Sequence, residues 1–106
     1  GLLSTVTEAA FVINIITSLE DAFANSILIY PNPSDDLLFL ELNNKARGEL
    51  DIRILDTSGK IMHLQQNLKQ TEMFKIQLPT HNLKQGVYLI DIQQGDQRSI
   101  IRMMKN

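Results

Sequence analysis

Cysteine and tryptophan are missing from this sequence of 106 residues, and so is a marked excess of charge of either sign. Without cysteine there can be no disulfide framework, no thiolate metal site and no cysteine nucleophile. The formal net charge of −2 argues against a nucleic-acid-binding protein, which needs a basic surface to neutralise phosphates. Hydrophobic residues make up 43% of the chain, which is ordinary for one globular domain.

A long uninterrupted apolar run is also lacking. The longest apolar stretch, Ala9–Leu19, is broken by polar residues such as Asn14 and Thr17, and it is shorter than the roughly 20 residues that cross a bilayer. It also lacks the basic start of a signal peptide, because Glu8 is the only charge before it. We therefore expect no membrane-spanning segment and, for an exported protein, a signal peptide further upstream.

From Ile27 onward the sequence has the pattern of short strands separated by turns. Apolar residues form short runs or alternate with polar ones, and residues that break strands follow each run. The expected strands are Ile27–Tyr30, Leu37–Leu42, Leu50–Ile54, Lys60–Leu64, Phe74–Leu78, Val87–Ile92 and Gln97–Met104. Seven short strands at this spacing predict an all-β fold, a sandwich of two antiparallel sheets.

Two turns predict β-hairpins. Asp56–Gly59 separates the third and fourth expected strands, and Gly59 can adopt a positive φ there. Gln94–Asp96 separates the last two strands in the same way. A calcium loop or a serine nucleophile at Asp56–Gly59 is not expected, because the alternating acids of a calcium loop and the Gly-x-Ser-x-Gly pattern are both missing.

Residues 1–26 have a different character. Residues 1–17 are interpreted as the end of an upstream region or as an extra edge strand, because Phe11–Ile16 is rich in strand-forming residues. That strand could complete an upstream domain, or add to a sheet edge here or in a neighbouring molecule. Residues 18–26 are polar and are interpreted as a linker with one helical turn capped by Ser18. The domain itself is predicted over residues 27–106.

Four motifs follow one another in this domain. Tyr30–Pro33 comes after a short apolar strand, Ile52–Gly59 ends in a turn, Asn82–Tyr88 leads into another strand, and a short basic strand closes the sequence. In this order and spacing, the motifs resemble the C-terminal sorting domain of the type IX (Por) secretion system of the Bacteroidetes lineage. The resemblance covers residues 18–106, and Asp35-Asp36 stands where the family often has Gly or Asn.

The resemblance implies an Ig-like β-sandwich with no active site and no cofactor. Such domains stand at the end of exported cargo proteins, so it implies an upstream cargo domain in the same chain. After the cargo reaches the periplasm, an outer-membrane translocon recognises the domain, and a sortase-like peptidase commonly removes it. The cargo is then linked to a surface glycolipid or released, so the expected location is the cell surface or the medium.

The candidate recognition residues belong to the four motifs. They are Pro31, Asn32, Pro33, Asp56, Gly59, Leu83, Gly86, Tyr88, Arg102 and Lys105. Structural roles compete with a contact to the translocon at most of them. The prolines fix φ at a corner between the sheets, where Asn32 can bond its own backbone, and Gly86 permits a turn. Tyr88 is expected to be a corner tyrosine, with a buried ring and a hydroxyl bonded to the backbone.

The basic end of the sequence allows two interpretations. Arg98, Arg102 and Lys105 are not accompanied by any acid from residue 98 onward. They can protect a solvated edge strand by charge. Alternatively, this strand with Arg102 and Lys105 is what the export machinery grips, as the resemblance implies.

An enzyme is the least expected class, because no convergent set of titratable groups appears. His63 and His81 lack a metal-ligand spacing and are expected at surface or edge positions. Asp35 and Asp36 are adjacent, so in an extended chain they point to opposite faces, and they are expected to begin a strand. No metal site and no nucleic-acid partner are predicted.

A carbohydrate-binding or adhesive module and a passive spacer are the alternative functions. Sugar-binding modules usually present aromatic rings on one face, but the chain has no tryptophan. Its phenylalanines, including Phe39, mostly follow a core-like alternation. Spacers usually lie between domains, so an end of the chain at Asn106 speaks against that role.

Overall fold

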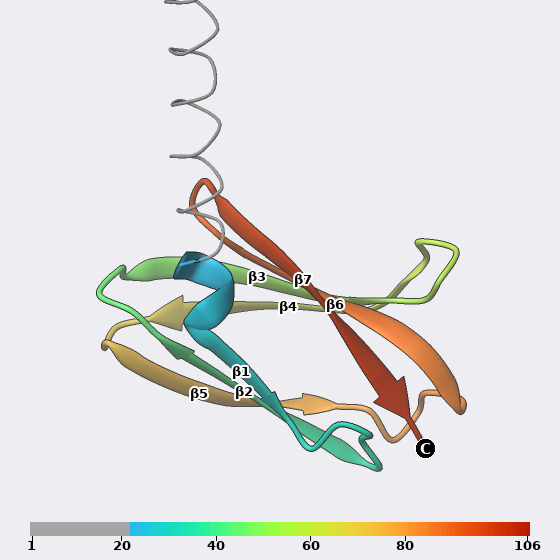
Figure 1. Cartoon of the computed structure of the whole chain (residues 1–106). Helices are drawn as coiled ribbons and strands as arrows, with labels where there is room; N and C mark the ends of the chain where they lie inside the picture. The colour runs from blue at the N-terminus through green and yellow to red at the C-terminus, as the bar shows by residue number, and fades with distance from the viewer. Residues whose placement is uncertain (1–21) are drawn as a thin grey trace, which may run out of the picture.

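The structure is a computed structural model that describes residues 22–106. The expectations for the strand Phe11–Ile16 and for a cap at Ser18 lie outside the described residues. A single helical turn at residues 22–25 precedes seven strands (Figure 1). The strands are β1 (Ile27–Tyr30), β2 (Leu37–Asn43), β3 (Gly48–Leu55), β4 (Ile61–Lys69), β5 (Met73–Pro79), β6 (Gly86–Gln94) and β7 (Gln97–Lys105).

The strands form two antiparallel sheets that pack face to face (Figure 1). One sheet has the order β1-β2-β5 and the other has the order β4-β3-β6-β7. Every pairing within them is antiparallel, so the predicted all-β sandwich is confirmed. Both predicted hairpins are present, since β3 pairs with β4 and β6 pairs with β7.

The core lies between the sheets and is built from alternate residues of each strand. In β3, Leu50, Ile52 and Ile54 are fully buried, while Asp51 and Arg53 between them face outward. Successive side chains of a strand point to opposite faces, so this alternation follows from strand geometry. The other buried hydrophobic residues are Phe23, Leu38, Leu40, Leu42, Leu78, Tyr88, Ile90, Ile92 and Met103.

Phe23 extends the core beyond the strands. It belongs to the helical turn, and its side chain is only 2% exposed. The amide and the hydroxyl of Ser26 both donate to the carbonyl of Phe23, and the amide of Asn43 donates to the carbonyl of Ser26. The helical turn, which falls within the segment interpreted as a linker, is therefore packed and bonded onto the sandwich.

Phe39 does not follow the core-like alternation expected of it. Leu38 and Leu40 occupy the inner face of β2, so Phe39 between them must point outward. Its ring stacks on that of Tyr30 with the centroids 5.5 Å apart, and the ammonium of Lys75 lies 5.1 Å from the Phe39 centroid. The apolar run Leu37–Leu40 does not show which residues face the core, and the burial of Leu38 and Leu40 between the two sheets reveals it.

The buried side chain of Lys69 links two loops at one end of the sandwich. This side chain is fully buried, and its ammonium donates to the carbonyls of Asn44, Ala46 and Thr71 at 2.7, 2.8 and 2.6 Å. Burial lowers the pKa of this ammonium, and Arg47 lowers it further. The side chain ties the β2–β3 and β4–β5 loops together, because three carbonyls from these loops share one donor group.

Candidate recognition site at the end of β7

A short segment crosses from one sheet to the other directly after β1. This segment, residues 31–34, is called the strap, and both of its X-Pro peptide bonds are cis. Ser34 forms a parallel bridge with Lys105 of β7. The amide of Ser34 donates to the carbonyl of Met104 at 2.8 Å, and the amide of Asn106 donates to the carbonyl of Ser34 at 2.9 Å. The strap therefore covers the end of the outer edge of β7.

Asn32 adds a side-chain contribution to this pairing. Its Oδ1 accepts a hydrogen bond from the amide of Met104 at 3.0 Å, and its Nδ2 donates to the carbonyl of Arg102 at 3.3 Å. The amide side chain thus bonds β7, rather than its own backbone as the sequence suggested. Two motifs separated by most of the domain, Pro31–Pro33 and the basic strand, are brought together here.

A polar cluster, named the clasp, lies at the end of the strap and consists of the buried side chains of Ser34, Thr80 and Lys105 and the main-chain carbonyl of Asp35. Ser34 and Thr80 are fully buried, and their hydroxyls lie 3.0 Å apart. The carbonyl of Asp35 accepts hydrogen bonds from the Thr80 hydroxyl and from the Lys105 ammonium. Asp35 and Asp36 lie in the bend before β2, not in the strand as expected, and the carbonyl of Asp36 accepts a hydrogen bond from the amide of Thr80 at 3.0 Å.

The three basic residues of β7 have different surroundings. Lys105 is 6% exposed, so its ammonium points into the fold. Arg98 is paired with the nearly buried carboxylate of Asp91, with Nε–Oδ1 and Nη2–Oδ2 distances of 2.9 and 2.8 Å. This carboxylate raises the pKa of Arg98. Arg102 is exposed and remains the cation of β7 that is open to a partner.

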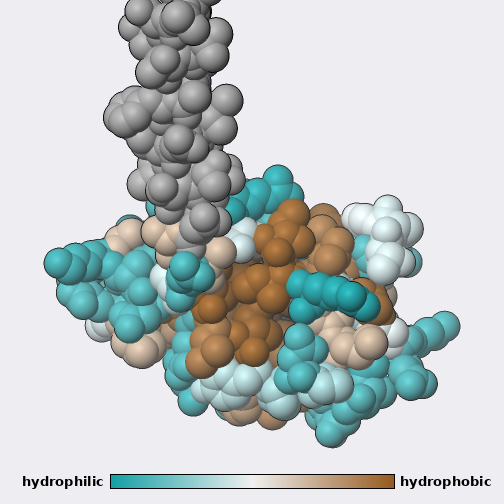
Figure 2. Space-filling model, in the orientation of Figure 1, coloured by the Kyte–Doolittle hydropathy of each residue, from teal (hydrophilic) through white to brown (hydrophobic). Residues whose placement is uncertain are grey.

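The exposed surface at this place is small and mixed in polarity. Asn32, Arg102 and Met104 line a shallow depression, which we name the β7 rim. Met104 is 42% exposed, and Pro31 and Pro33 of the strap are also exposed. Figure 2 shows hydrophobic side chains gathered over β1 and β7 on this side of the molecule. The rim therefore offers a cation, an amide and an apolar surface within one area.

The turn Asp56–Gly59 has a self-contained structural role. One carboxylate oxygen of Asp56 accepts hydrogen bonds from the Ser58 amide, the Ser58 hydroxyl and the Lys60 amide. These bonds lower the pKa of Asp56, and the bond from the Ser58 hydroxyl has the largest effect. Gly59 has a φ of +90°, as the sequence predicted. The residues of this motif thus form the β3–β4 turn, separate from the strap.

The motif Asn82–Tyr88 builds the corner before β6. The hydroxyl of Tyr88 donates to the carbonyl of Lys84 at 2.7 Å, and the residue is 6% exposed. Gly86 has a φ of +150°, which an L side chain rarely adopts, and Leu83 packs against the core. The predicted corner tyrosine is confirmed. It contributes to the site indirectly, because Tyr88 pairs with Met103 of β7.

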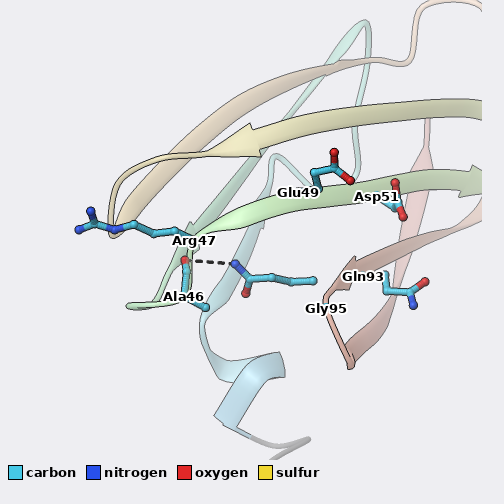
Figure 3. Close-up of a pocket in the computed structure, with 7 residues that line it drawn as sticks. Ala46, Arg47, Glu49, Asp51, Gln93 and Gly95 are labelled. Carbon is cyan, nitrogen blue, oxygen red and sulfur yellow. Dashed lines mark hydrogen bonds between the residues drawn. The ribbon is translucent and has the colours of Figure 1, made fainter.

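A second groove lies elsewhere, between β3 and the β6–β7 turn (Figure 3). Glu49 and Asp51 project from β3 toward it, whereas Arg47 points away from them (Figure 3). Asp51 accepts a hydrogen bond from Gln66 at 2.9 Å, and Gln94 donates to the carbonyl of Ala46 at 3.2 Å. Within residues 22–106, no group of three or more His, Cys, Asp or Glu side chains is placed to hold a metal ion.

The histidines occupy the ordinary positions expected of them. His63 lies on the edge strand β4 and bonds Gln65 at 3.0 Å, while His81 is exposed in a turn. In the described part of the chain, no helix is long and apolar enough to cross a membrane.

Sequence reasoning missed Ser34 and Thr80, the two buried hydroxyls of the clasp. Their partners are distant in the sequence, and no local pattern marks a polar residue that will be buried by such contacts. The proline at each preceding position, Pro33 and Pro79, is the one local sign that the chain leaves a regular strand at these points.

Comparison with known proteins identifies the family. The family model described as "Secretion system C-terminal sorting domain" matches residues 28–106, a range that contains all four motifs and the whole β7 rim. No curated protein matches the chain. The chain belongs to the family of type IX secretion C-terminal sorting domains.

Proposed function

We propose that this member of the sorting-domain family is a non-catalytic signal that carries an attached cargo protein through the type IX secretion system. The match over residues 28–106 supports this proposal most directly. Membership implies an upstream cargo and a cargo that is secreted or displayed on the cell surface. The proposed route runs through the periplasm to an outer-membrane translocon, which recognises the folded domain.

The β7 rim is the proposed contact with the translocon. Arg102 is exposed and Asn32 lies beside it, so both can contact a partner without unfolding of the domain. Lys105 is buried in the clasp, and we propose that it acts by holding β7 against the strap. Asp56, Gly59 and Tyr88 act on export through folding, because their bonds lie within the turn and the corner that they build.

We further propose that a sortase-like peptidase removes the domain by cutting within residues 17–26. Phe23 is held in the core and the carbonyl of Ser26 accepts a hydrogen bond from the amide of Asn43, so we expect the cut to fall in the part of this range that precedes Phe23. Protein sequencing of the released fragment is expected to find an N-terminus no later than Phe23. A first residue after Phe23 would contradict this placement.

A fusion experiment tests the function as a whole. The chain is attached to the C-terminus of a fluorescent reporter with a signal peptide, in a host with a working type IX system and in the same host with a disabled translocon. Reporter on the surface or in the medium is expected only in the intact host. Retention of a folded fusion in the periplasm of both hosts would contradict the sorting function.

Replacement of Arg102 by alanine tests the β7 rim in the same assay. Arg102→Ala is expected to reduce export several-fold, because the loss of an interface contact worth about 1 kcal/mol lowers affinity about fivefold. The matched control is Lys45→Ala, which removes an exposed cation from the β2–β3 loop. Equal export of both variants, with unchanged stability, would exclude Arg102 as a contact.

A carbohydrate-binding or adhesive module is the second candidate, and one observation favours it. Tyr30 and Phe39 both face outward from the three-stranded sheet, beside Lys75. However, the rings stack on each other with an interplanar angle of 23°, so each covers part of the face that a sugar would need. A glycan array in which binding is lost with Tyr30→Ala would establish this function, and an array without specific binding would exclude it.

A further inference from the structure

Three of the four sheet edges are shielded against pairing with another strand. β1 has four residues and is followed by Pro31. β5 carries Lys75 and ends at Pro79. β7 is covered at its end by the strap and carries exposed arginines. Short strands, proline, charge and covering segments are the usual means by which proteins prevent such pairing.

In the described part of the chain, the fourth edge, formed by β4, has no proline, exposed charge or covering segment, and a bulge interrupts only its start. Within residues 22–106, β4 has β3 as its sheet neighbour on one side and none on the other. No Asp, Glu, Lys or Arg occurs from Ile61 to Leu68. A register shift opposite Ile54 and Leu55 interrupts the start of β4, which leaves His63–Lys69 as a regular stretch with a free edge.

In this stretch the polar side chains face inward and the leucines face outward, which is the opposite of the usual arrangement in a strand that covers a core. On the inner face, His63, Gln65 and Asn67 form a chain of hydrogen bonds at 3.0 and 2.8 Å. On the outer face, Leu64 and Leu68 are 54% and 57% exposed. Burying these leucines inside the domain would require a shift of one residue, which would turn the polar chain outward. The leucines thus remain available for another surface.

The pattern is symmetric about Gln66. Leu64 and Leu68 lie at equal distances on either side of it on the outer face, and Gln65 and Asn67 do so on the inner face. In an antiparallel pair of two β4 strands centred on Gln66, Leu64 of each copy would lie opposite Leu68 of the other. Gln65 would likewise lie opposite Asn67, so leucines would pair with leucines on the outer face and amide side chains with amide side chains on the inner face.

We propose that β4 is a homodimerisation edge, at which a second copy of this chain adds its β4 in antiparallel register about Gln66. The two four-stranded sheets then form one continuous sheet with two-fold symmetry. The absence of charge on this edge favours a second copy, because like charges opposite each other would oppose the pairing. This inference does not depend on the proposed function.

The dimer is expected to be weak and to dissociate on dilution. A single strand pair with four leucines buries less surface than the roughly 1,600 Å² of a standard stable interface. Sedimentation velocity of the 106-residue chain over a range of concentrations is therefore the first measurement. A weight-average mass that rises from monomer to dimer is expected, and a monomer at every concentration would overturn the proposal.

A cysteine at the proposed two-fold axis tests the register. The chain has no native cysteine, and directly paired residues have Cα atoms about 4.5–5.5 Å apart, within the range that a disulfide bridges. Gln66→Cys is expected to give a covalent dimer under mild oxidation. The control is Gln93→Cys, an exposed residue on the same face of central strand β6. Equal crosslinking of both variants would overturn the register.

Charge variants test the leucine contacts. Leu64→Lys with Leu68→Lys places like charges opposite each other and is expected to abolish the dimer. Leu64→Lys with Leu68→Glu places opposite charges across the two-fold axis and is expected to restore it. The control is Leu28→Lys, which is equally exposed at 55% but lies on β1, and it should leave dimerisation unchanged. The same dimerisation in all variants would overturn the proposal.

These experiments would also detect two other strands that could pair with the β4 edge. Pairing of Phe11–Ile16 with β4 of its own chain would give a monomer in which Gln66→Cys does not crosslink. A docking strand of the export machinery would give a monomer whose export falls with Leu64→Lys and Leu68→Lys. Circular dichroism of each variant confirms that it is folded, so either outcome counts against the second copy.

Discussion

Single side chains stabilise this domain chiefly by bonding main-chain groups in loops and corners. Lys69 donates to three carbonyls, Asp56 accepts from two amides and a hydroxyl, and Tyr88 donates to one carbonyl. A main-chain group that loses such a partner stays in place, because the backbone around it is fixed. The cost of each replacement is therefore set by the group that is left unpaired.

Replacement of the corner tyrosine by phenylalanine isolates one of these bonds. Tyr88→Phe keeps the buried ring but removes the donor to the Lys84 carbonyl, so we expect a loss of about 1 kcal/mol in the free energy of unfolding. Urea unfolding measures it. Tyr30→Phe, which removes a hydroxyl that among residues 22–106 interacts only with the exposed ammonium of Lys75, should change stability by less than about 0.5 kcal/mol. Equal effects of the two variants would show that the corner bond contributes nothing.

The Asp56 turn should make stability depend on pH. Because the folded-state pKa lies below the ordinary value of 3.8, the stabilisation is present above this value and is lost as the pH falls through the folded-state pKa. Asp56→Asn is expected to be less stable than the native chain at neutral pH, and the difference should shrink in acid. Urea midpoints across the pH range test this, and Asp96→Asn controls for the loss of one negative charge. A difference that stays constant with pH would contradict the expectation.

At the scale of the elements, the pairing of the strap with β7 depends on few bonds. Two of them come from the side chain of Asn32, and two more come from the backbone of Ser34. The strap lies outside the hydrogen-bonded order of either sheet. We therefore expect this end of β7 to open more readily than the paired centre of the sheet.

Replacement of Asn32 by alanine should loosen the end of β7 without unfolding the domain. Asn32→Ala removes an acceptor from the Met104 amide, so this amide is expected to exchange its hydrogen faster, while the amide of Ile90 in the core is unchanged. The free energy of unfolding should fall by no more than about 1 kcal/mol, because both bonds are exposed to solvent. Asn82→Ala in the turn before β6 is the control. Unchanged exchange at Met104 would show that Ser34 alone holds the strap.

At the scale of the whole molecule, both sheets contribute to one core and should unfold together. Ile52 is fully buried in β3, which is paired on both sides, so Ile52→Ala is expected to cost about 2–5 kcal/mol. Tyrosine fluorescence reports on both sheets, since Tyr30 lies in β1 and Tyr88 in β6. It should follow circular dichroism in a single transition for both the native chain and the variant. Leu28→Ala, at a residue that is 55% exposed on β1, is the control, and separate transitions would contradict one cooperative unit.

The sequence was informative where the determinants of structure are local. The alternation of Leu50, Ile52 and Ile54, the turn at Gly59 and the corner at Tyr88 each arise from neighbours within a few residues, so they were predictable. The outward orientation of Phe39 was missed, because an unbroken apolar run does not show which residues face inward. The strap and the clasp were missed, because their bonds join residues up to 72 positions apart.

The parallel pairing of the strap with β7 also joins the parts of the sandwich that are synthesised first and last. While a ribosome is still adding β7, the amide of Ser34 has no acceptor and the sheet edge beside it is open. A chain truncated before Met104 lacks the carbonyl that accepts the hydrogen bond of the Ser34 amide, so the strap cannot pair with β7. The strap can close only when the last residues of β7 are present, so a closed strap at the protein surface indicates that the whole domain has been synthesised.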